Sequence, residues 1–365
     1  MKATFQWLND SVYTKPLSPA CKMCAEGSKM VVLITGLCPS NCYYCPLSEK
    51  KIGNDKIFAD EWELDNEDDT GKLIKEAELI NATGAGITGG DPLVVWKRTK
   101  KYIELLKQNF GSKFHIHLYT SGLKNIEHVD DFVSAGLDEI RFHPLLEYWK
   151  NMGSSHLKNI SRDDIDVAIE IPAIPGMEKE IFSLIQWANR HNIKWINLNE
   201  LEFSETNAEN LIKKGFTVKD DISSAVKGSQ ETALKVTEHA KDLDIGIHYC
   251  SSSFKDGIQL RNRILRRAKN IAKDYEIITE DGTILKGIIE SSRISLRDLK
   301  KFILRNFKIE ENQIHLNTEK NRLEAPISFL EMFVKKMKKR GIDCFIVEEY
   351  PTADQLEVER IKLSN

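Results

Sequence analysis

Short apolar runs alternate with longer amphipathic segments along residues 30–250. The apolar runs are rich in β-branched residues, which favour strands, and they lie near 30–35, 85–88, 114–119, 138–142, 167–171, 194–198 and 244–249. Between several of them, apolar residues recur at helical spacing, as in 72–81, 99–109 and 178–190. Six or seven such β/α units predict an α/β fold built on a curved parallel sheet, a partial (β/α) barrel.

The pattern changes after residue 254. Residues 255–273 carry seven Lys or Arg side chains and a single acid, and they predict a basic linker helix. Beyond it, the Glu280-Asp281-Gly282 turn signal predicts a hairpin. Two helices and further short strands are expected at 296–306, 328–340, 313–316, 322–324, 344–348 and 355–361. We therefore expect an N-terminal Cys-x2-Cys segment (1–29), a core (30–254), a basic linker helix (255–274) and a small C-terminal α+β domain (275–365).

Composition and charge narrow the class of protein. A net charge of −3 and a pI near 6.3 give no general attraction to nucleic acid or anionic membrane. No apolar run approaches the length of about 18 residues that a membrane span needs, and the N-terminus lacks the apolar segment of a signal peptide. Five of the seven cysteines lie between Cys21 and Cys45, which favours metal binding in a reducing compartment. We expect a cytoplasmic protein without membrane contact.

Three cysteines, Cys38, Cys42 and Cys45, follow the first predicted strand within eight residues. Thiolates bind zinc or iron-sulfur clusters, and four of them normally complete such a site. Because only three thiols are present here, the fourth ligand position of the site is open to a distant residue or to a substrate. Pro39 and Asn41 favour a loop in which the thiols can converge. A zinc site or buried thiols are the alternatives that the residues alone leave open.

The Cys-x3-Cys-x2-Cys order, with Tyr44 just before the last cysteine, resembles the signature of radical SAM enzymes. The segment Gly89-Gly90-Asp91-Pro92 follows the second predicted strand and is similar to the family's Gly-Gly-Glu-Pro segment. The arrangement is closest to archaeal-type proteins related to pyruvate formate-lyase activating enzyme. The resemblance implies a partial (β/α) barrel of the radical SAM type, in which the three cysteines bind three irons of a [4Fe-4S] cluster.

The resemblance also implies the chemistry. S-adenosylmethionine would bind the fourth iron, and the reduced cluster would cleave it to methionine and a 5′-deoxyadenosyl radical that abstracts hydrogen from an unidentified substrate. An electron donor such as a ferredoxin or flavodoxin is implied as a partner. The catalytic residues on the substrate side are unknown.

The resemblance assigns further residues to the S-adenosylmethionine site. Tyr44 would lie near the adenine, and the backbone at Gly89 and Gly90 would meet the methionyl amino group. Asp91 replaces the family's Glu, so its carboxylate sits one methylene back. The remaining assignments are Thr120 and Ser121 at the carboxylate or ribose, and Glu170 with Asn197 or Asn199 at the ribose or adenine. A turn-capping pair is the alternative for Thr120 and Ser121.

A second metal site is expected from Cys21, Cys24 and Cys250. The first two form a Cys-x2-Cys pair, and Cys250 ends the seventh predicted strand. If that strand closes toward the first, the three thiols can converge on zinc, iron or a second cluster, and His248 is a candidate fourth ligand. Cys344, inside a strand pattern, is interpreted as a core thiol.

Alternative functions remain open at this stage. The basic run at 255–273 can follow an RNA backbone or be the solvated face of a helix. An RNA or protein substrate is therefore considered, modified by radical methyl transfer or another reaction, as is activation of a glycyl-radical partner. The alternative from another class is a non-catalytic iron-sulfur or zinc protein. Against it, Gly-Gly-Asp-Pro indicates a site for a sulfonium cofactor that a simple carrier does not need.

Overall fold

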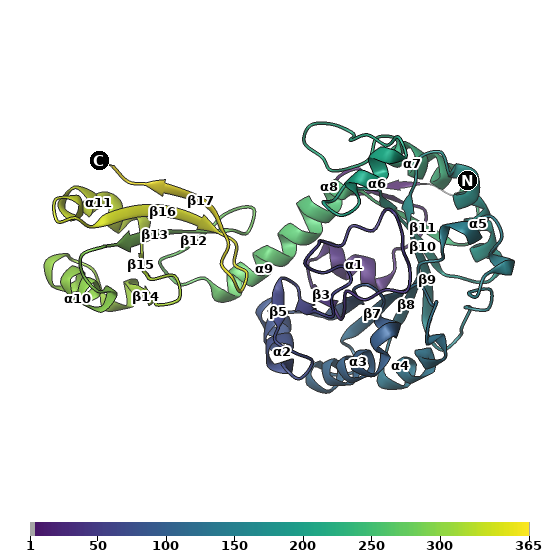
Figure 1. Ribbon diagram of the computed structural model, residues 1–365, viewed down its shortest axis with the longest axis horizontal. Helices are drawn as coiled ribbons and strands as arrows, with labels where there is room; N and C mark the ends of the chain where they lie inside the picture. The colour runs from purple at the N-terminus through teal and green to yellow at the C-terminus, as the bar shows by residue number, and fades with distance from the viewer. Residues whose placement is uncertain (1–3, 365) are drawn as a thin grey trace. The chain divides into compact units, whose positions relative to one another are not determined.

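The computed structural model describes residues 4–364, and the chain divides into two compact units, Met1–Asn262 and Arg263–Asn365 (Figure 1). Within the described residues, the first unit contains an 11-stranded sheet with the order β1-β2-β11-β10-β9-β8-β7-β6-β3-β4-β5. Its strands are β1 (Phe5–Gln6), β2 (Val12–Tyr13), β3 (Lys29–Leu33), β4 (Ile57–Ala59), β5 (Trp62–Leu64), β6 (Gly84–Thr88), β7 (His115–Thr120), β8 (Glu139–Phe142), β9 (Asp166–Ala173), β10 (Trp195–Glu200) and β11 (Gly246–Cys250).

The seven predicted parallel strands are confirmed as β3 and β6 to β11, which pair in parallel and in chain order. Most residues of these strands are buried, as is typical of a parallel sheet. The sheet curves without closing (Figure 1). The hairpin of β4 and β5 covers the β3 edge, and β2 pairs antiparallel with β11. The seventh strand, β11, therefore lies beside the N-terminal hairpin of β1 and β2 and not beside the first parallel strand, β3.

Helices cover the outer face of this sheet (Figure 1). They are α2 (Thr70–Leu79), α3 (Trp96–Phe110), α4 (Val129–Ala135), α5 (Glu178–Arg190), α6 (Ala208–Lys213) and α7 (Ser229–Ala240). In α5 the residues predicted to share one face, Ile181, Leu184, Ile185 and Ala188, are all buried. The predicted partial barrel of class α/β is confirmed.

One helix, α1 (Pro19–Ala25), lies inside the curve of the sheet (Figure 1). It begins at Ser18, whose hydroxyl oxygen accepts a hydrogen bond from the amide of Cys21, and Pro19 occupies the first helical position. The helix packs against β3, β6 and β7. The N-terminal segment thus fills the barrel with the element that carries Cys21 and Cys24.

The second unit is an antiparallel sheet with two helices, so the predicted α+β domain is confirmed. Its strands are β12 (Ile277–Ile278), β13 (Ile284–Glu290), β14 (His315–Asn317), β15 (Arg322–Ala325), β16 (Asp343–Glu349) and β17 (Glu357–Lys362), and its helices are α10 (Leu296–Asn306) and α11 (Ile327–Lys338). Both helices pack on the sheet face that carries Ile289, Leu323 and Cys344. Cys344 is a buried core thiol that contacts Met337 at 3.3 Å, as predicted.

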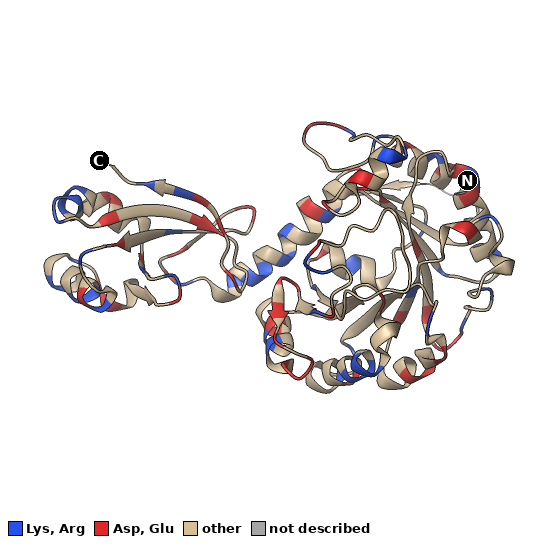
Figure 2. Cartoon of the chain, viewed as in Figure 1, with Lys and Arg blue, Asp and Glu red and all other residues tan. Residues whose placement is uncertain are grey.

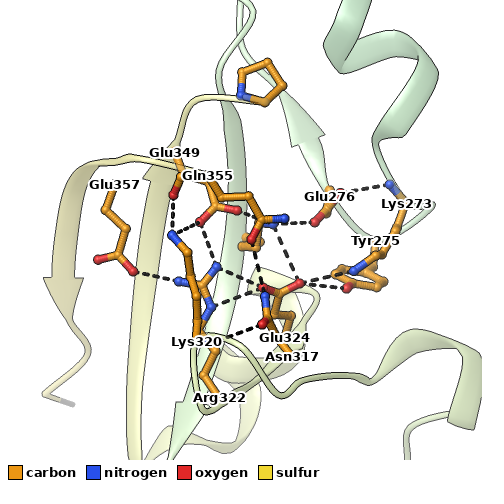
Figure 3. A network of polar contacts seen from close by, with 12 residues as sticks. Lys273, Tyr275, Glu276, Asn317, Lys320, Arg322, Glu324, Glu349, Gln355 and Glu357 are labelled. Atoms are coloured by element: carbon orange, nitrogen blue, oxygen red, sulfur yellow. Dashed lines mark hydrogen bonds and ion pairs between the residues drawn. The ribbon is translucent and has the colours of Figure 1, made fainter. Parts of the chain in front are cut away.

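The opposite face of this sheet carries a buried network of charged side chains (Figure 3). Lys286, 3% exposed, lies 2.7 Å from Glu276 and 2.6 Å from Glu349. Arg322, 1% exposed, lies 2.8 Å from Glu324 and 2.7 Å from Glu349. Each buried cation has several carboxylate partners, which offsets the cost of removing it from water.

The basic stretch is helical throughout 252–271, as α8 (Ser252–Phe254), the π-helical turn η5 (Lys255–Leu260) and α9 (Arg261–Ile271). Figure 2 shows Lys and Arg along α9. Not all of this charge faces water, because Arg267 is buried and donates to the carbonyl of Pro351.

Candidate functional site

The cysteine loop begins where β3 ends, at the carboxyl edge of the sheet. Cys38 is exposed, and Cys42 and Cys45 are half-buried. The Ser40 amide lies 3.4 Å from Cys38 Sγ, and the Cys45 amide donates to the Cys42 carbonyl at 3.0 Å. Burial raises the pKa of the Cys38 and Cys42 thiols. Metal binding here therefore releases protons and becomes tighter as the pH rises.

The Gly-Gly-Asp-Pro segment meets the stem of this loop directly. The Gly90 amide donates to the Thr35 carbonyl at 2.7 Å, and the Asp91 amide donates to the Leu37 carbonyl at 2.8 Å. These bonds continue the β3–β6 pairing past the ends of both strands. A Cβ atom at Gly89 or Gly90 would lie 2.2 Å from the Thr35 oxygen or 2.1 Å from the Leu37 oxygen. Both glycines are required because the two segments touch backbone to backbone.

Asp91 is buried, 1% exposed, and its carboxylate is fully engaged. It accepts the hydroxyl groups of Thr120 and Ser121 at 2.7 and 2.5 Å, and the amides of Ser121 and Leu93 at 3.0 and 3.1 Å. The structure thus places Asp91, Thr120 and Ser121 together beside the glycine segment. The hydroxyl hydrogens of Thr120 and Ser121 point to Asp91, so donation to a cofactor would require them to leave it.

Tyr44 is anchored through His143. The Tyr44 hydroxyl lies 2.9 Å from His143 Nε2, and His143 Nδ1 lies 2.8 Å from the Glu170 carbonyl oxygen. Burial lowers the pKa of His143, which is therefore neutral. Its Nδ1 must donate to the carbonyl, so Nε2 accepts the Tyr44 proton. The cysteine loop is in this way tied to the ends of β8 and β9.

Two residues that the sequence did not single out hold the loop from the other side. Asn207 Nδ2 donates to the Tyr44 carbonyl at 3.1 Å, and the Thr206 hydroxyl donates to the Leu47 carbonyl at 2.7 Å. Both lie between β10 and α6, far from the cysteines in sequence. No local pattern marks them, since an Asn and a Thr in a polar loop are ordinary.

Glu170 and Asn197, which the resemblance assigns to the ribose or adenine, lie side by side in the barrel interior. Glu170 accepts from Arg141 Nη1 at 2.6 Å, from Asn197 at 3.0 Å and from Asn199 at 2.8 Å. Burial would raise the pKa of Glu170, but the Arg141 charge and these hydrogen bonds lower it below its usual value. Arg141 also contacts Glu139 at 2.6 Å. Glu139 and Arg141, two charged residues that alternate within the buried strand Glu139–Phe142, were the available signal for this interior network.

The same interior network reaches Cys21. Its sulfur lies 3.4 Å from Arg141 Nη2 and 3.4 Å from Asn197 Nδ2. Burial alone would raise the pKa of Cys21, but Arg141 and His248 lower it to about 6. Burial raises the pKa of Cys24 to about 11 and raises that of Cys250 further. The Cys21 side chain is therefore the thiolate among the interior cysteines at neutral pH.

Neither cysteine set is gathered around one point. Within residues 4–364, no three His, Cys, Asp or Glu side chains are arranged to hold a single ion. Three thiolates in one loop are the donor set of a [4Fe-4S] cluster in which each thiolate binds a different iron. Cys38, Cys42 and Cys45 in their loop fit such a cluster.

Comparisons with known proteins match both units. The Radical SAM superfamily matches residues 32–198, and a "Domain of unknown function (DUF8061)" matches residues 282–363. A protein of Methanocaldococcus jannaschii named "Putative glycyl-radical enzyme activating enzyme" is 44% identical over 361 residues, which cover 95% of this chain and 93% of that protein.

Solved structures of Streptococcus suis SuiB also match. SuiB bound to S-adenosylmethionine is 10% identical with a TM-score of 0.40, over 64% of this chain and 53% of that chain. SuiB bound to the precursor peptide SuiA is 10% identical with a TM-score of 0.42, over 72% of this chain and 61% of that chain. The chain thus spans less than two thirds of SuiB. Separately, none of the helices in residues 4–364 has both the length and the apolar character to cross a bilayer.

Proposed function

Since the chain belongs to the radical SAM superfamily, we propose that it is an activating enzyme that abstracts a hydrogen atom from a partner protein. Cys38, Cys42 and Cys45 hold its [4Fe-4S] cluster in this proposal. The main support for the proposal is that the Gly-Gly-Asp-Pro segment contacts the stem of the cysteine loop. Gly90 and Asp91 bond to the backbone of Thr35 and Leu37, which lead directly into the cysteine loop.

The chain's own residues position and enclose the reaction site. When bound, the reduced cluster supplies the electron that cleaves S-adenosylmethionine to methionine and a 5′-deoxyadenosyl radical. The backbone beside Gly89 and Gly90 has no side chain to block a methionyl group. Tyr44, through His143, and Asn207 fix the loop from two sides. A loop fixed in this way keeps its three thiols in place for the cluster.

A protein is the proposed substrate for two reasons. The relative of 44% identity carries the name of an activating enzyme for glycyl-radical enzymes. In addition, α1 and the Arg141–Glu170 network occupy the interior beneath the loop. A substrate must therefore reach the radical at the rim of the barrel, and a protruding protein segment can do so. The electron donor is proposed to be a ferredoxin or flavodoxin, and the seven free cysteines agree with a reducing cytoplasm.

Low-temperature EPR of the anaerobically reconstituted, dithionite-reduced protein tests the cluster assignment. We expect a cluster signal that shifts when S-adenosylmethionine is added and is lost in Cys42→Ala. Cys344→Ala, which removes a core thiol of the second unit, is the matched control and keeps the signal. A signal that ignores S-adenosylmethionine, or that survives Cys42→Ala, contradicts the assignment.

The substrate class is tested by 5′-deoxyadenosine formation. Reduced enzyme and S-adenosylmethionine are incubated with an anaerobic extract of the source cells, left intact, treated with protease or treated with nuclease. Stimulation that disappears after protease treatment, with the protease inactivated before the assay, but survives nuclease treatment supports a protein substrate. If only nuclease treatment abolishes the stimulation, the substrate is RNA and the proposal of a protein substrate is wrong.

A further inference from the structure

His248 is a buried imidazole that lies beside the Cys21 thiol, whose pKa it lowers. Its side chain on β11 is 4% exposed, and within residues 4–364 neither Nδ1 nor Nε2 makes a hydrogen bond of ordinary geometry. The rings of Trp7 and Phe254 flank it, with centroids at 5.6 and 6.4 Å. A buried polar group without a hydrogen bond is unfavourable, which makes this imidazole a candidate to bind a further ligand.

Three thiols lie near His248 inside the barrel, those of Cys21, Cys24 and Cys250. In the parallel pairing of β10 and β11, His248 lies beside Asn197, and the Asn197 side chain contacts Cys21 Sγ at 3.4 Å. Cys24 is one turn farther along α1, on the same helix face as Cys21. Cys250 is two residues beyond His248, on the same strand face. The placement of α1 inside the barrel is what brings the two segments together.

We propose that Cys21, Cys24, Cys250 and His248 bind one Zn²⁺ ion that fastens α1 to β11. Three thiolates and one imidazole are a donor set of structural zinc sites. The N–H groups of Arg141 and Asn197 at Cys21 Sγ supply the outer hydrogen bonds that such ligands have. The ion also gives His248 a ligand bond.

Zinc suits this site better than a second cluster. A cluster needs room for several irons and sulfides, but the side chains of Arg141 and Asn197 already contact Cys21. The four donors stand apart in the structure, since no three of them surround one point. Zinc binding in this proposal therefore includes movement of the Cys24 and Cys250 side chains toward Cys21 and His248.

The metal content of the full chain tests this site. Protein is expressed with added zinc and purified anaerobically, and zinc and iron are measured by mass spectrometry of the elements. We expect about one zinc per chain in the native protein, and at least a fivefold loss in Cys21→Ser and in Cys250→Ser. Cys344→Ser and the triple variant Cys38→Ala/Cys42→Ala/Cys45→Ala keep zinc, and only the triple variant loses the iron of the radical cluster.

A spectroscopic measurement keeps the test valid if Cys21→Ser fails to fold. Co²⁺ is added to the triple variant, and we expect thiolate-to-cobalt absorption with the visible bands of a tetrahedral site. Absence of these bands, or a native protein without stoichiometric zinc, overturns the proposal. Iron in excess of one cluster that disappears in Cys21→Ser also overturns it, in favour of a second cluster.

Discussion

Asp91 shows how a shorter side chain takes on a structural role. In the family's Gly-Gly-Glu-Pro segment this position is a glutamate, whereas Asp91 stays close to its own backbone. Its carboxylate joins the glycine segment to Thr120 and Ser121 at the end of β7. The same residue begins the short 3-10 helix Pro92–Val95 by accepting the Leu93 amide. One carboxylate thus connects β6, β7 and the stem of the cysteine loop.

We expect Asp91→Asn to lower the free energy of unfolding of the first unit by about 1–3 kcal/mol. The amide has one acceptor oxygen, and its NH₂ group faces donors. All six tryptophans lie in the first unit, so denaturant unfolding followed by tryptophan fluorescence reports on it. The matched control Asp163→Asn, at an exposed loop carboxylate, should change stability by less than about 0.5 kcal/mol. Equal stability of the two variants would refute a structural role for Asp91.

At the scale of elements, α1 depends on a residue outside its own span. The Ser18 hydroxyl caps the helix and also accepts a hydrogen bond from Arg141 Nη2 at 2.9 Å. A seven-residue helix is too short to be stable alone. Its place in the barrel therefore rests on the cap and on contacts to β3, β6 and β7.

Ser18→Ala should destabilise α1 by about 1–2 kcal/mol, because the cap is lost and Arg141 loses a partner. Ser295 caps α10 through the Asp298 amide at 3.2 Å, and Ser295→Ala is the matched control in the second unit. Hydrogen-exchange mass spectrometry should show faster exchange at residues 19–25 in the first variant and at 296–306 in the second. Unchanged exchange at 19–25 would show that packing alone holds α1.

At the scale of the whole molecule, the two units are stabilised in different ways. The first has a large apolar core on a parallel sheet, while one sheet face of the second carries the charged network around Lys286 and Arg322. The second unit contains no tryptophan. Far-ultraviolet circular dichroism reports on both units, and its comparison with tryptophan fluorescence separates them.

Lys286→Met should destabilise the second unit by about 3–5 kcal/mol, since it leaves Glu276 and Glu349 without their shared cation. We expect a shifted circular dichroism transition and an unchanged fluorescence transition. Lys362→Met removes an exposed ion pair with Asp343 and should cost no more than about 1 kcal/mol. Similar effects of the two substitutions would mean that the network adds little stability.

The network also predicts an acid-sensitive second unit. Burial opposes ionisation of Glu324, but Lys286, Asn317 and Arg322 lower its pKa to about 2, from an ordinary value of 4.5. Its contribution is complete above the unfolded pKa of 4.5 and is lost as the pH falls toward 2. The free energy of unfolding should decline in that window, and Glu324→Gln should make the decline shallower. An identical slope in the variant would contradict the lowered pKa.

The alternation of apolar runs and amphipathic segments was sufficient to predict β3 and β6 to β11, α5 and the α+β character of residues 275–365. These features follow from local sequence because burial selects the side chains at a period of two or 3.6 residues. The cysteine order and the Gly-Gly-Asp-Pro segment could also be recognised from the sequence. Metal binding requires thiolates at fixed spacing, and close approach of two backbones requires glycine.

Tertiary structure alone decided what surrounds these motifs. Thr206 and Asn207 bond to the cysteine loop, and α1 lies inside the barrel. Asn197 contacts Cys21 directly, and Glu170 is connected to Cys21 through Arg141. Such contacts join residues about 30 to 180 positions apart in the sequence. The side chains that make them are of common types, so no local sequence pattern marks them. The periodicity of apolar residues indicates which face of a helix or strand is buried. Which residues contact each other across the barrel interior depends on how the sheet curves and on which segments cover its edges.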